Sequence, residues 1–160
     1  MRSLPLTALC LALGWAAAGA APAGPAARHS EERIDEANLQ PRYLLQDVRG
    51  RVVTQETFHG RFQLIAFGFI SCPDVCPTTL LGIRNIMDAL GEKASRLQPI
   101  FITVDPERDE APVLRDYTAA FHPEILGLRG SPDLLRKAAE SFRVRYEKVR
   151  EPGAAPDIYT

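Results

Sequence analysis

The chain has 160 residues, of which 46% are hydrophobic, and a formal net charge of −1. This length and composition predict one globular domain. No basic stripe runs along the chain, so nucleic acid is excluded as an expected partner.

The first twenty residues have the pattern of a secretory signal peptide. Met1 and Arg2 form a basic start, residues 4–18 are apolar, and residues 18–20 are an acceptable cleavage site. The apolar part is shorter than the ~20 residues that span a bilayer, so a cleaved signal is favoured over an uncleaved anchor. Cys10 lies inside this segment and is not interpreted as a lipidation site. We expect an exported protein, periplasmic or membrane-associated facing the periplasm, that lies near the membrane without spanning it.

Residues 21–41 are rich in proline and alanine and then in charge, which predicts a flexible tether. His29 in this tether is expected to be solvated. Residues 42–160 form the expected folded domain. Two cysteines, Cys72 and Cys76, then remain in the mature chain, in an oxidising compartment.

The domain begins with a predicted hairpin and a buried strand. Residues 43–54 are expected to form two short strands around a turn at Gly50. His59 is interpreted as a turn residue because nothing nearby in sequence would join it as a metal ligand. Residues 62–69 are expected to be the central strand of a sheet.

Directly after this strand comes the motif Cys72-Pro-Asp-Val-Cys76-Pro. Apolar residues then recur at helical spacing up to Leu90, which predicts an amphipathic helix. Pro77 suits the first helical position, so Cys76 is expected to cap the helix. The two thiols would lie at the carboxyl end of a strand and the amino end of a helix, where ligands collect in α/β sheets.

Free N–H groups and the positive end of a helix favour thiolate over thiol. Two such thiols can close a disulfide or share a soft metal. In a helical loop their Cβ atoms would be about 5–6 Å apart, whereas a disulfide requires roughly 3.5–4.5 Å. The spacing favours a metal without excluding a disulfide. Two buried structural cysteines are the third interpretation.

The second half of the domain alternates strands and helices. Residues 98–104 are expected to form a buried strand, followed by an acidic loop, residues 105–109, and a helix over residues 110–121. Asp109 is expected either to cap that helix or, if the strands are parallel, to lie near the cysteines and help orient a partner.

A short strand over residues 126–128 precedes a helix that begins at Ser131 and Pro132 and runs to Phe142. Residues 144–149 alternate and predict a strand with no further strand or helix after it. The whole order predicts an α/β fold with a central sheet.

Three stretches together carry a family resemblance: Gly68-Phe-Ile-Ser-Cys-Pro-Asp-Val-Cys-Pro77, Thr103-Val-Asp-Pro-Glu-Arg-Asp109 and Phe121-His-Pro-Glu-Ile-Leu-Gly-Leu-Arg-Gly130. In these stretches the chain resembles the Sco/SenC family from about Tyr43 onward. The resemblance implies a thioredoxin-like fold with an N-terminal β-hairpin. It also implies a copper-binding protein, often membrane-anchored, that serves assembly of the binuclear copper centre of cytochrome c oxidase.

Within that resemblance, Cys72 and Cys76 match the positions of the family's cysteine ligands. The family's third copper ligand is a histidine in a Val-Asp-His-Ser element, and residues 157–160 match only the approach to it. We therefore expect a domain that lacks its last strands and helix, with the ligand position beyond Thr160. His122 matches a family position with no metal role and is not expected to replace it.

Two functions follow. The favoured one is a metallochaperone in which Cys72 and Cys76 hold copper, as Cu(I) or Cu(II), for a copper-accepting subunit of cytochrome c oxidase or another copper chaperone. The alternative is a thiol–disulfide oxidoreductase, in which Cys72 attacks, Cys76 resolves and a partner's cysteines are kept reduced. A histidine within reach would favour the metal, and its absence the redox function.

Overall fold

The structure is a computed structural model that describes residues 41–149 and 158–159. The predicted signal peptide, with Cys10, lies outside the described residues, as does the predicted tether apart from residue 41. Within the described part of the chain, no helix is long and apolar enough to cross a membrane.

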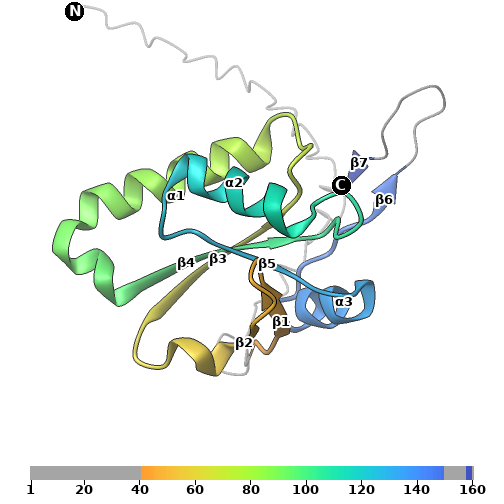
Figure 1. The fold of residues 1–160 in the computed structure, drawn as a ribbon, viewed down its shortest axis with the longest axis horizontal. Coiled ribbons are helices and arrows are strands. Elements are labelled where there is room, and N and C mark those ends of the chain that lie inside the picture. The colour runs from red at the N-terminus through yellow and green to blue at the C-terminus, as the bar shows by residue number, and fades with distance from the viewer. Residues whose placement is uncertain (1–40, 150–157, 160) are drawn as a thin grey trace, which may run out of the picture. The chain divides into compact units, whose positions relative to one another are not determined.

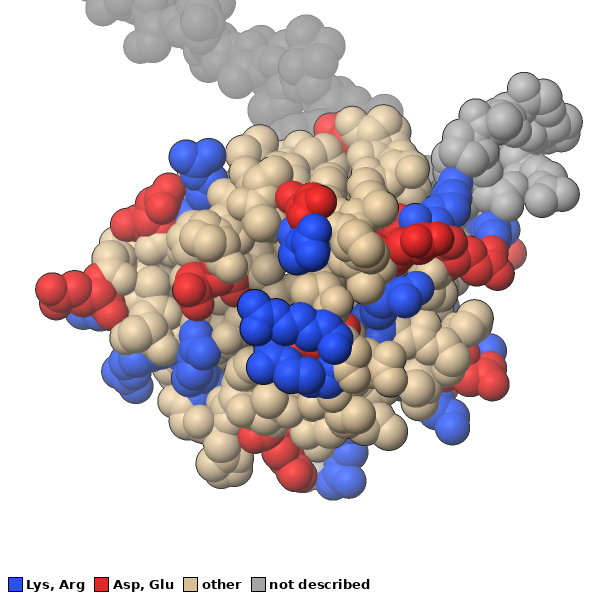
Figure 2. All heavy atoms as spheres, in the orientation of Figure 1, with Lys and Arg blue, Asp and Glu red and all other residues tan. Residues whose placement is uncertain are grey.

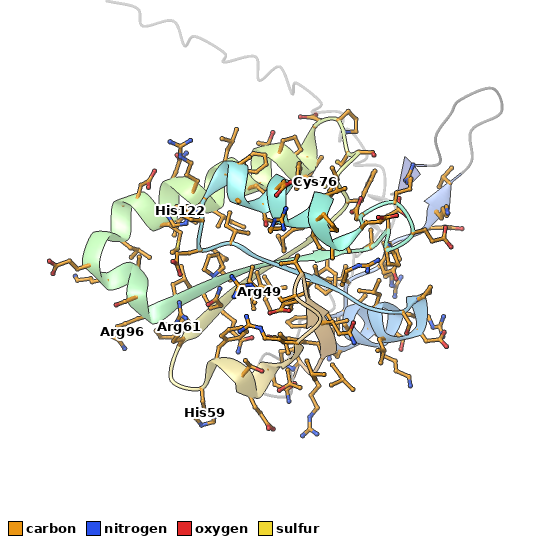
Figure 3. All side chains as sticks on the ribbon, viewed as in Figure 1. Arg49, His59, Arg61, Cys76, Arg96 and His122 are labelled. Carbon is orange, nitrogen blue, oxygen red and sulfur yellow. The ribbon has the colours of Figure 1, made fainter. Side chains whose placement is uncertain are left out.

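The predicted N-terminal hairpin is confirmed. Strands β1 (Leu44–Asp47) and β2 (Val52–Thr54) pair antiparallel, and the turn between them places Gly50 at φ 78°, which glycine adopts without steric cost. The buried carboxylate of Asp47 accepts the N–H groups of Arg49 and Arg51 at 2.8 and 2.9 Å. Figure 3 labels Arg49, and Figure 2 shows that basic and acidic side chains are interspersed on the same view of the molecule.

A short 3₁₀ helix, η2 (Gln55–Phe58), leads to the parallel part of the sheet. Here β3 (Phe62–Gly68) pairs with β4 (Leu97–Thr103), which pairs in turn with β5 (Leu126–Arg129). The strand order is β2-β1-β5-β4-β3. The prediction that β3 is the central strand is wrong: among the described residues it is an edge strand, because β4 alone pairs with it and β5 occupies the other side of β4.

Helices cover both faces of the sheet (Figure 1). Helices α1 (Val75–Leu90) and α2 (Ala111–Phe121) lie on one face, and α3 (Pro132–Ser141) lies on the other. Successive side chains of β4 point to opposite faces of the sheet. Ile100 and Ile102 pack on the α3 side, and Phe101 packs on the side of α1 and α2. The 3₁₀ helix η3 (Gly91–Arg96) connects α1 to β4.

Helix α3 begins as predicted, with the Ser131 hydroxyl accepting the N–H of Leu134 at 3.3 Å. Its carboxyl end is a Schellman turn: Arg143 has φ 55°, its N–H donates to Glu140 O, and the N–H of Val144 donates to Ala139 O at 2.8 Å. This turn carries the chain out of the helix into an irregular segment. The predicted strand over residues 144–149 is therefore wrong except at its end.

Only Lys148–Val149 of that segment forms a strand, β6. It pairs antiparallel with β7 (Ile158–Tyr159), so the prediction that no strand follows is also wrong.

Candidate metal centre

Two thiols lie where β3 ends and α1 begins. The thiol loop, residues 69–74, carries Cys72, and Cys76 is the second residue of α1. Because β3 and β4 are parallel, the acidic loop, residues 105–109, follows its strand at the same edge of the sheet. A hydrogen bond of 2.8 Å from the N–H of Val104, which directly follows β4, to the carbonyl oxygen of Gly68, the last residue of β3, joins the ends of the two strands. The prediction that the acidic loop lies at the same edge of the sheet as the cysteines is confirmed.

Helix α1 begins earlier than predicted. Asp74 is its N-cap and Val75 its first residue, so Cys76 lies in the first turn and is not the cap. Pro77 is the third helical residue. Its missing N–H costs no intrahelical hydrogen bond, because the first four N–H groups of a helix have no intrahelical acceptor. The extended preference of a residue before proline is therefore not followed at Cys76, which lies in the first turn of the helix.

The two cysteines have different surroundings. Cys76 is 8% exposed, whereas Cys72 is partly exposed, and both are free thiols. The N–H of Cys76 donates to Sγ of Cys72 at 3.4 Å, and the N–H of Cys72 donates to the carbonyl oxygen of Phe69 at 3.2 Å. Since Cys72 precedes the helix, the Cβ separation expected for a helical loop does not apply to this pair.

The sulfur of Cys76 rests against the backbone of β3. A Cβ atom added to Gly68 would lie 2.7 Å from Sγ of Cys76 and 2.9 Å from Cε2 of Phe101. Real Cβ atoms do not approach other atoms so closely, so glycine at this position makes room for the thiol. The motif contains this glycine, but no local pattern in the sequence reveals its role.

The pKa of the Cys72 thiol is lowered. Burial by itself would raise it, but the hydrogen bond with the Cys76 thiol and the N–H groups of Cys76, Asp74 and Val75 stabilise the thiolate and outweigh burial. These N–H groups belong to the start of α1, where backbone donors have no intrahelical partner. Cys72 is therefore the thiol that ionises first.

The pKa of Cys76 moves the opposite way, to about 11. Burial is the main cause, and the hydrogen bond with Cys72 and the negative charges of Cys72 and Asp109 add to it. The pair thus consists of one accessible, acidic thiol and one buried, weakly acidic thiol.

Two carboxylates of the acidic loop, those of Asp105 and Asp109, are buried, whereas Glu107 is exposed. Asp109 is 1% exposed, and its Oδ2 accepts the hydroxyl of Thr103 at 2.5 Å and the N–H of Ile70 at 3.1 Å. The prediction that Asp109 caps the following helix is wrong, because Glu110 is the N-cap of α2 and makes no side-chain cap. Burial raises the pKa of Asp109, although both hydrogen bonds oppose that effect. Asp109 instead ties the start of the thiol loop to β4.

Asp105, also 1% exposed, pairs with the guanidinium of Arg108, and its N–H donates to Thr103 Oγ1 at 3.0 Å. Arg129 on β5 donates to the carbonyl oxygen of Pro106 at 2.7 Å. The acidic loop is held by its own side chains and by a neighbouring strand.

The two histidines in the described part of the chain, His59 and His122, lie elsewhere. His122 is the C-cap of α2, and its Nδ1 accepts the N–H of Glu124 at 3.2 Å, while His59 caps the short helix η2. Figure 3 shows both labelled well away from Cys76. In residues 41–149 and 158–159, no group of three or more His, Cys, Asp and Glu side chains could hold a metal.

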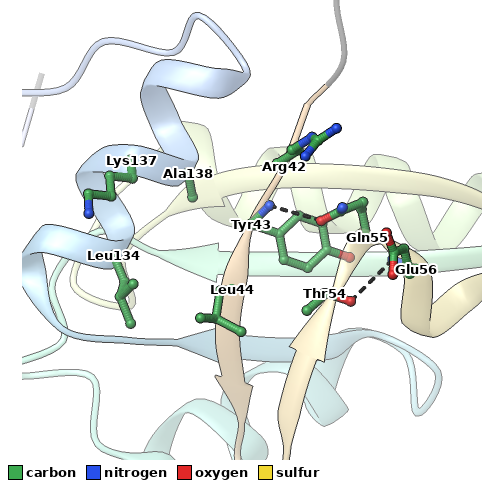
Figure 4. A pocket seen from close by; sticks show the side chains of 9 residues that line it. All are labelled: Arg42, Tyr43, Leu44, Thr54, Gln55, Glu56, Leu134, Lys137 and Ala138. Carbon is green, nitrogen blue, oxygen red and sulfur yellow. Dashed lines mark hydrogen bonds between the residues drawn. The ribbon is translucent and has the colours of Figure 1, made fainter.

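Two cavities differ in their relation to the thiols. The larger, about 420 Å³, lies between the hairpin and α3, where the N–H of Tyr43 donates to Oε1 of Gln55 at 3.2 Å (Figure 4). The other, about 290 Å³, opens directly on Cys72 and Cys76. Val144, Arg145 and Tyr146 line it, although they lie about 70 residues from the motif. Sequence reasoning missed these three residues, because it assigned them to a regular strand.

Comparison with known proteins places these features in context. A family model described as SCO1/SenC matches residues 31–159. An SCO2-like protein of Rickettsia prowazekii is 37% identical over 115 residues, which are 72% of this chain and 56% of the relative. The mitochondrial protein SCO1 of Saccharomyces cerevisiae is 42% identical over 103 residues, covering 64% of this chain and 35% of that protein.

Among solved structures, Bradyrhizobium japonicum ScoI with copper bound superimposes with a TM-score of 0.69 at 37% identity, covering 74% of this chain and 75% of that one. This agreement confirms the predicted thioredoxin-like α/β class. The chain spans about half the length of the Rickettsia relative and about a third of the yeast one.

Proposed function

Because this chain belongs to the SCO1/SenC family, we propose that it is a copper-binding protein that serves cytochrome c oxidase assembly. Cys72 and Cys76 hold the ion, which is the cargo of the protein. The ion passes to a copper-accepting subunit of the oxidase or to another copper chaperone. The single observation that carries the proposal is the pair of free thiols at the start of α1, one of them accessible.

The donor chemistry supports copper. Thiolate sulfur is a soft ligand that selects Cu(I). Burial is the main cause of the raised pKa of Cys76, and a metal ion bound to both sulfurs would offset the negative charges of Cys72 and Asp109 that add to it. The accessible Cys72 is suited to receive and release the ion, because it is ionised first. The buried Cys76, packed on Gly68, fixes the second donor in place.

An anaerobic competition titration tests this function. The full chain carries Cys10→Ser, so that Cys72 and Cys76 are its only thiols, and Cu(I) is partitioned between the reduced protein and a chelator of known affinity. We expect one ion per chain, and a loss of at least tenfold in affinity for Cys72→Ser and for Cys76→Ser. His59→Ala and His122→Ala are matched controls, and we expect both to bind as the parent does. Parent affinity in either cysteine variant would disprove ligation by two thiolates.

The unequal thiols favour a second function, thiol–disulfide exchange. The Cys72 thiolate would attack a partner's disulfide to form a mixed disulfide and release one partner thiolate, which takes up a proton. Cys76 would then lose its proton, attack Cys72 Sγ and displace the second partner thiol. The chain loses two electrons, and the partner disulfide gains them.

Alkylation followed by mass spectrometry separates the two functions. We expect Cys72 to be alkylated well before Cys76 at pH 8, and the pair to close an intramolecular disulfide in air. A reduction potential low enough to reduce a partner's disulfide, with rapid turnover of a test disulfide, would favour the oxidoreductase. Slow exchange together with tight copper binding would favour the chaperone.

We also propose that residues 1–20 export the chain and that residues 21–41 tether the domain, residues 42–160, near the membrane. Amino-terminal sequencing of the protein isolated from the periplasm tests this, and a start after residue 20 is expected. An intact Met1 in the exported protein would exclude signal cleavage.

A further inference from the structure

The cavity beside the thiols is lined mostly by apolar and aromatic residues. It measures about 290 Å³, and besides Cys72 and Cys76 it is lined by Phe67, Gly68, Phe69, Val75, Val104, Val144, Arg145 and Tyr146. Phe69 and Val104 are buried with Cys76 in one cluster, and Phe67 and Tyr146 pack against it. The thiols therefore form part of the wall of an apolar cavity.

The rim carries two features that a partner would meet first. Val75 is 69% exposed at the first turn of α1, which is a large exposure for an aliphatic side chain. Arg145 is exposed and is the one charged residue that lines the cavity. An incoming segment that is apolar and also carries a carboxylate would match both.

Building on the proposed copper function, we propose that this cavity receives a methionine side chain of the partner, next to an acidic residue that pairs with Arg145. The methionine fills the apolar cavity and brings its thioether sulfur to Cys72 and Cys76. The carboxylate orients the segment on the rim.

Methionine fits this cavity better than other apolar residues for two reasons. Its thioether is polarisable and makes favourable contacts with aromatic rings, of which Phe67, Phe69 and Tyr146 line the wall. It is also a soft donor for Cu(I). Leucine would fill the space but could not bind the ion.

Short peptides can test both parts of the proposal. The probes are acetyl-Gly-Glu-X-Gly-amide, with X as methionine, its isostere norleucine, or serine. Binding to the full, reduced chain with Cys10→Ser is measured by calorimetry, first without copper and then with one equivalent of Cu(I). Without copper, we expect methionine and norleucine to bind alike and serine at least tenfold more weakly. With copper, we expect the methionine peptide alone to tighten, by at least tenfold.

Variants of the chain locate the contact. Arg145→Glu should weaken the methionine peptide several-fold, because it repels the glutamate. Arg143→Glu is the matched control, since Arg143 is exposed two residues away and does not line the cavity; we expect it to bind as the parent does.

Equal binding of serine and norleucine without copper, or no preference for methionine over norleucine with copper, would overturn the proposal. Equal effects of Arg145→Glu and Arg143→Glu would also contradict it. A chain that binds no Cu(I) but prefers methionine and norleucine over serine would disprove the copper function and still support this cavity as the docking pocket.

Discussion

The thiol loop and the acidic loop occupy equivalent places in the fold and are built in opposite ways. Each follows a strand of the parallel pair β3 and β4, and each leads into a helix on the same face of the sheet. The acidic loop buries Asp105 and Asp109 and pairs both. The thiol loop leaves Cys72 partly exposed, with its sulfur facing the N–H groups at the start of α1.

The acidic loop therefore supports the structure around the site, and the thiol loop carries the reactive groups. Asp105 and Asp109 of the acidic loop interact with groups inside the protein. One of these interactions, in which Asp109 accepts the N–H of Ile70, holds the thiol loop in place. The thiol loop keeps its reactive atoms available. We infer that substitutions in the acidic loop cost stability, whereas substitutions of Cys72 cost binding.

The largest expected effect tests that separation. Asp109→Ala leaves the N–H of Ile70 and the hydroxyl of Thr103 without their acceptor in a buried site. We expect a loss of about 2–4 kcal/mol in the free energy of unfolding, because each unpaired buried group costs roughly 1–3 kcal/mol. Urea unfolding of the reduced protein measures it.

Asp109→Asn is the matched control, because its side-chain oxygen can still accept both hydrogen bonds, and we expect a clearly smaller loss. Cys72→Ser should change the free energy of unfolding by less than about 0.5 kcal/mol, since Cys72 is a partly exposed site. A loss for Cys72→Ser as large as that for Asp109→Ala would remove the distinction between the two loops.

A second substitution tests how the thiol loop is seated. Gly68→Ala would place a methyl group 2.7 Å from Sγ of Cys76, so the thiol or the backbone must move. We expect a loss of about 1–3 kcal/mol in stability from overpacking, and a weaker affinity for Cu(I), because the second donor is displaced. Urea unfolding and the chelator titration measure the two effects.

Gly82→Ala is its control within α1, where nothing lies within 4 Å of an added Cβ atom. We expect it to stabilise the chain by about 0.5–1 kcal/mol and to leave copper affinity unchanged. If Gly68→Ala bound Cu(I) as the parent does, the close approach of Cys76 to β3 would have no role in the site.

The smallest expected effect concerns pH. The pKa of Cys76 is raised to about 11 in the folded chain, so from about pH 9 the unfolded chain releases this proton and the folded chain keeps it. Stability must then fall as pH rises from 9 to 11, because the folded state binds more protons. Relative to Cys76→Ala, we expect the reduced protein to lose about 1–2 kcal/mol over this range.

Urea unfolding at several pH values under reductant measures this difference. In a Cys72→Ser background the loss should shrink, because the neighbouring thiolate charge that raises the pKa of Cys76 is gone. A difference between parent and Cys76→Ala that does not change with pH would contradict the burial of this thiol.

The sequence predicted those features correctly that depend on residues close together in the chain. The Gly50 hairpin, the strand after it, the amphipathic helix to Leu90 and the Ser131-Pro132 helix start all depend on neighbours within a few residues. The Schellman turn at Arg143 was missed because the left-handed position is usually glycine, and here an arginine occupies it. The alternation after it therefore resembled a strand, although Val144 and Tyr146 face the cavity of the thiols.

By itself, the sequence determined the α/β class, the family resemblance and the placing of both thiols at a strand end and a helix start, since these follow from short-range periodicity and motif chemistry. Only the tertiary structure decided that Asp109 holds the thiol loop instead of capping α2, and that Gly68 makes room for Cys76. It alone placed β3 at the edge of the described sheet. Each of these depends on burial and on contacts between segments far apart in the chain, for which the order of residues carries no local signal.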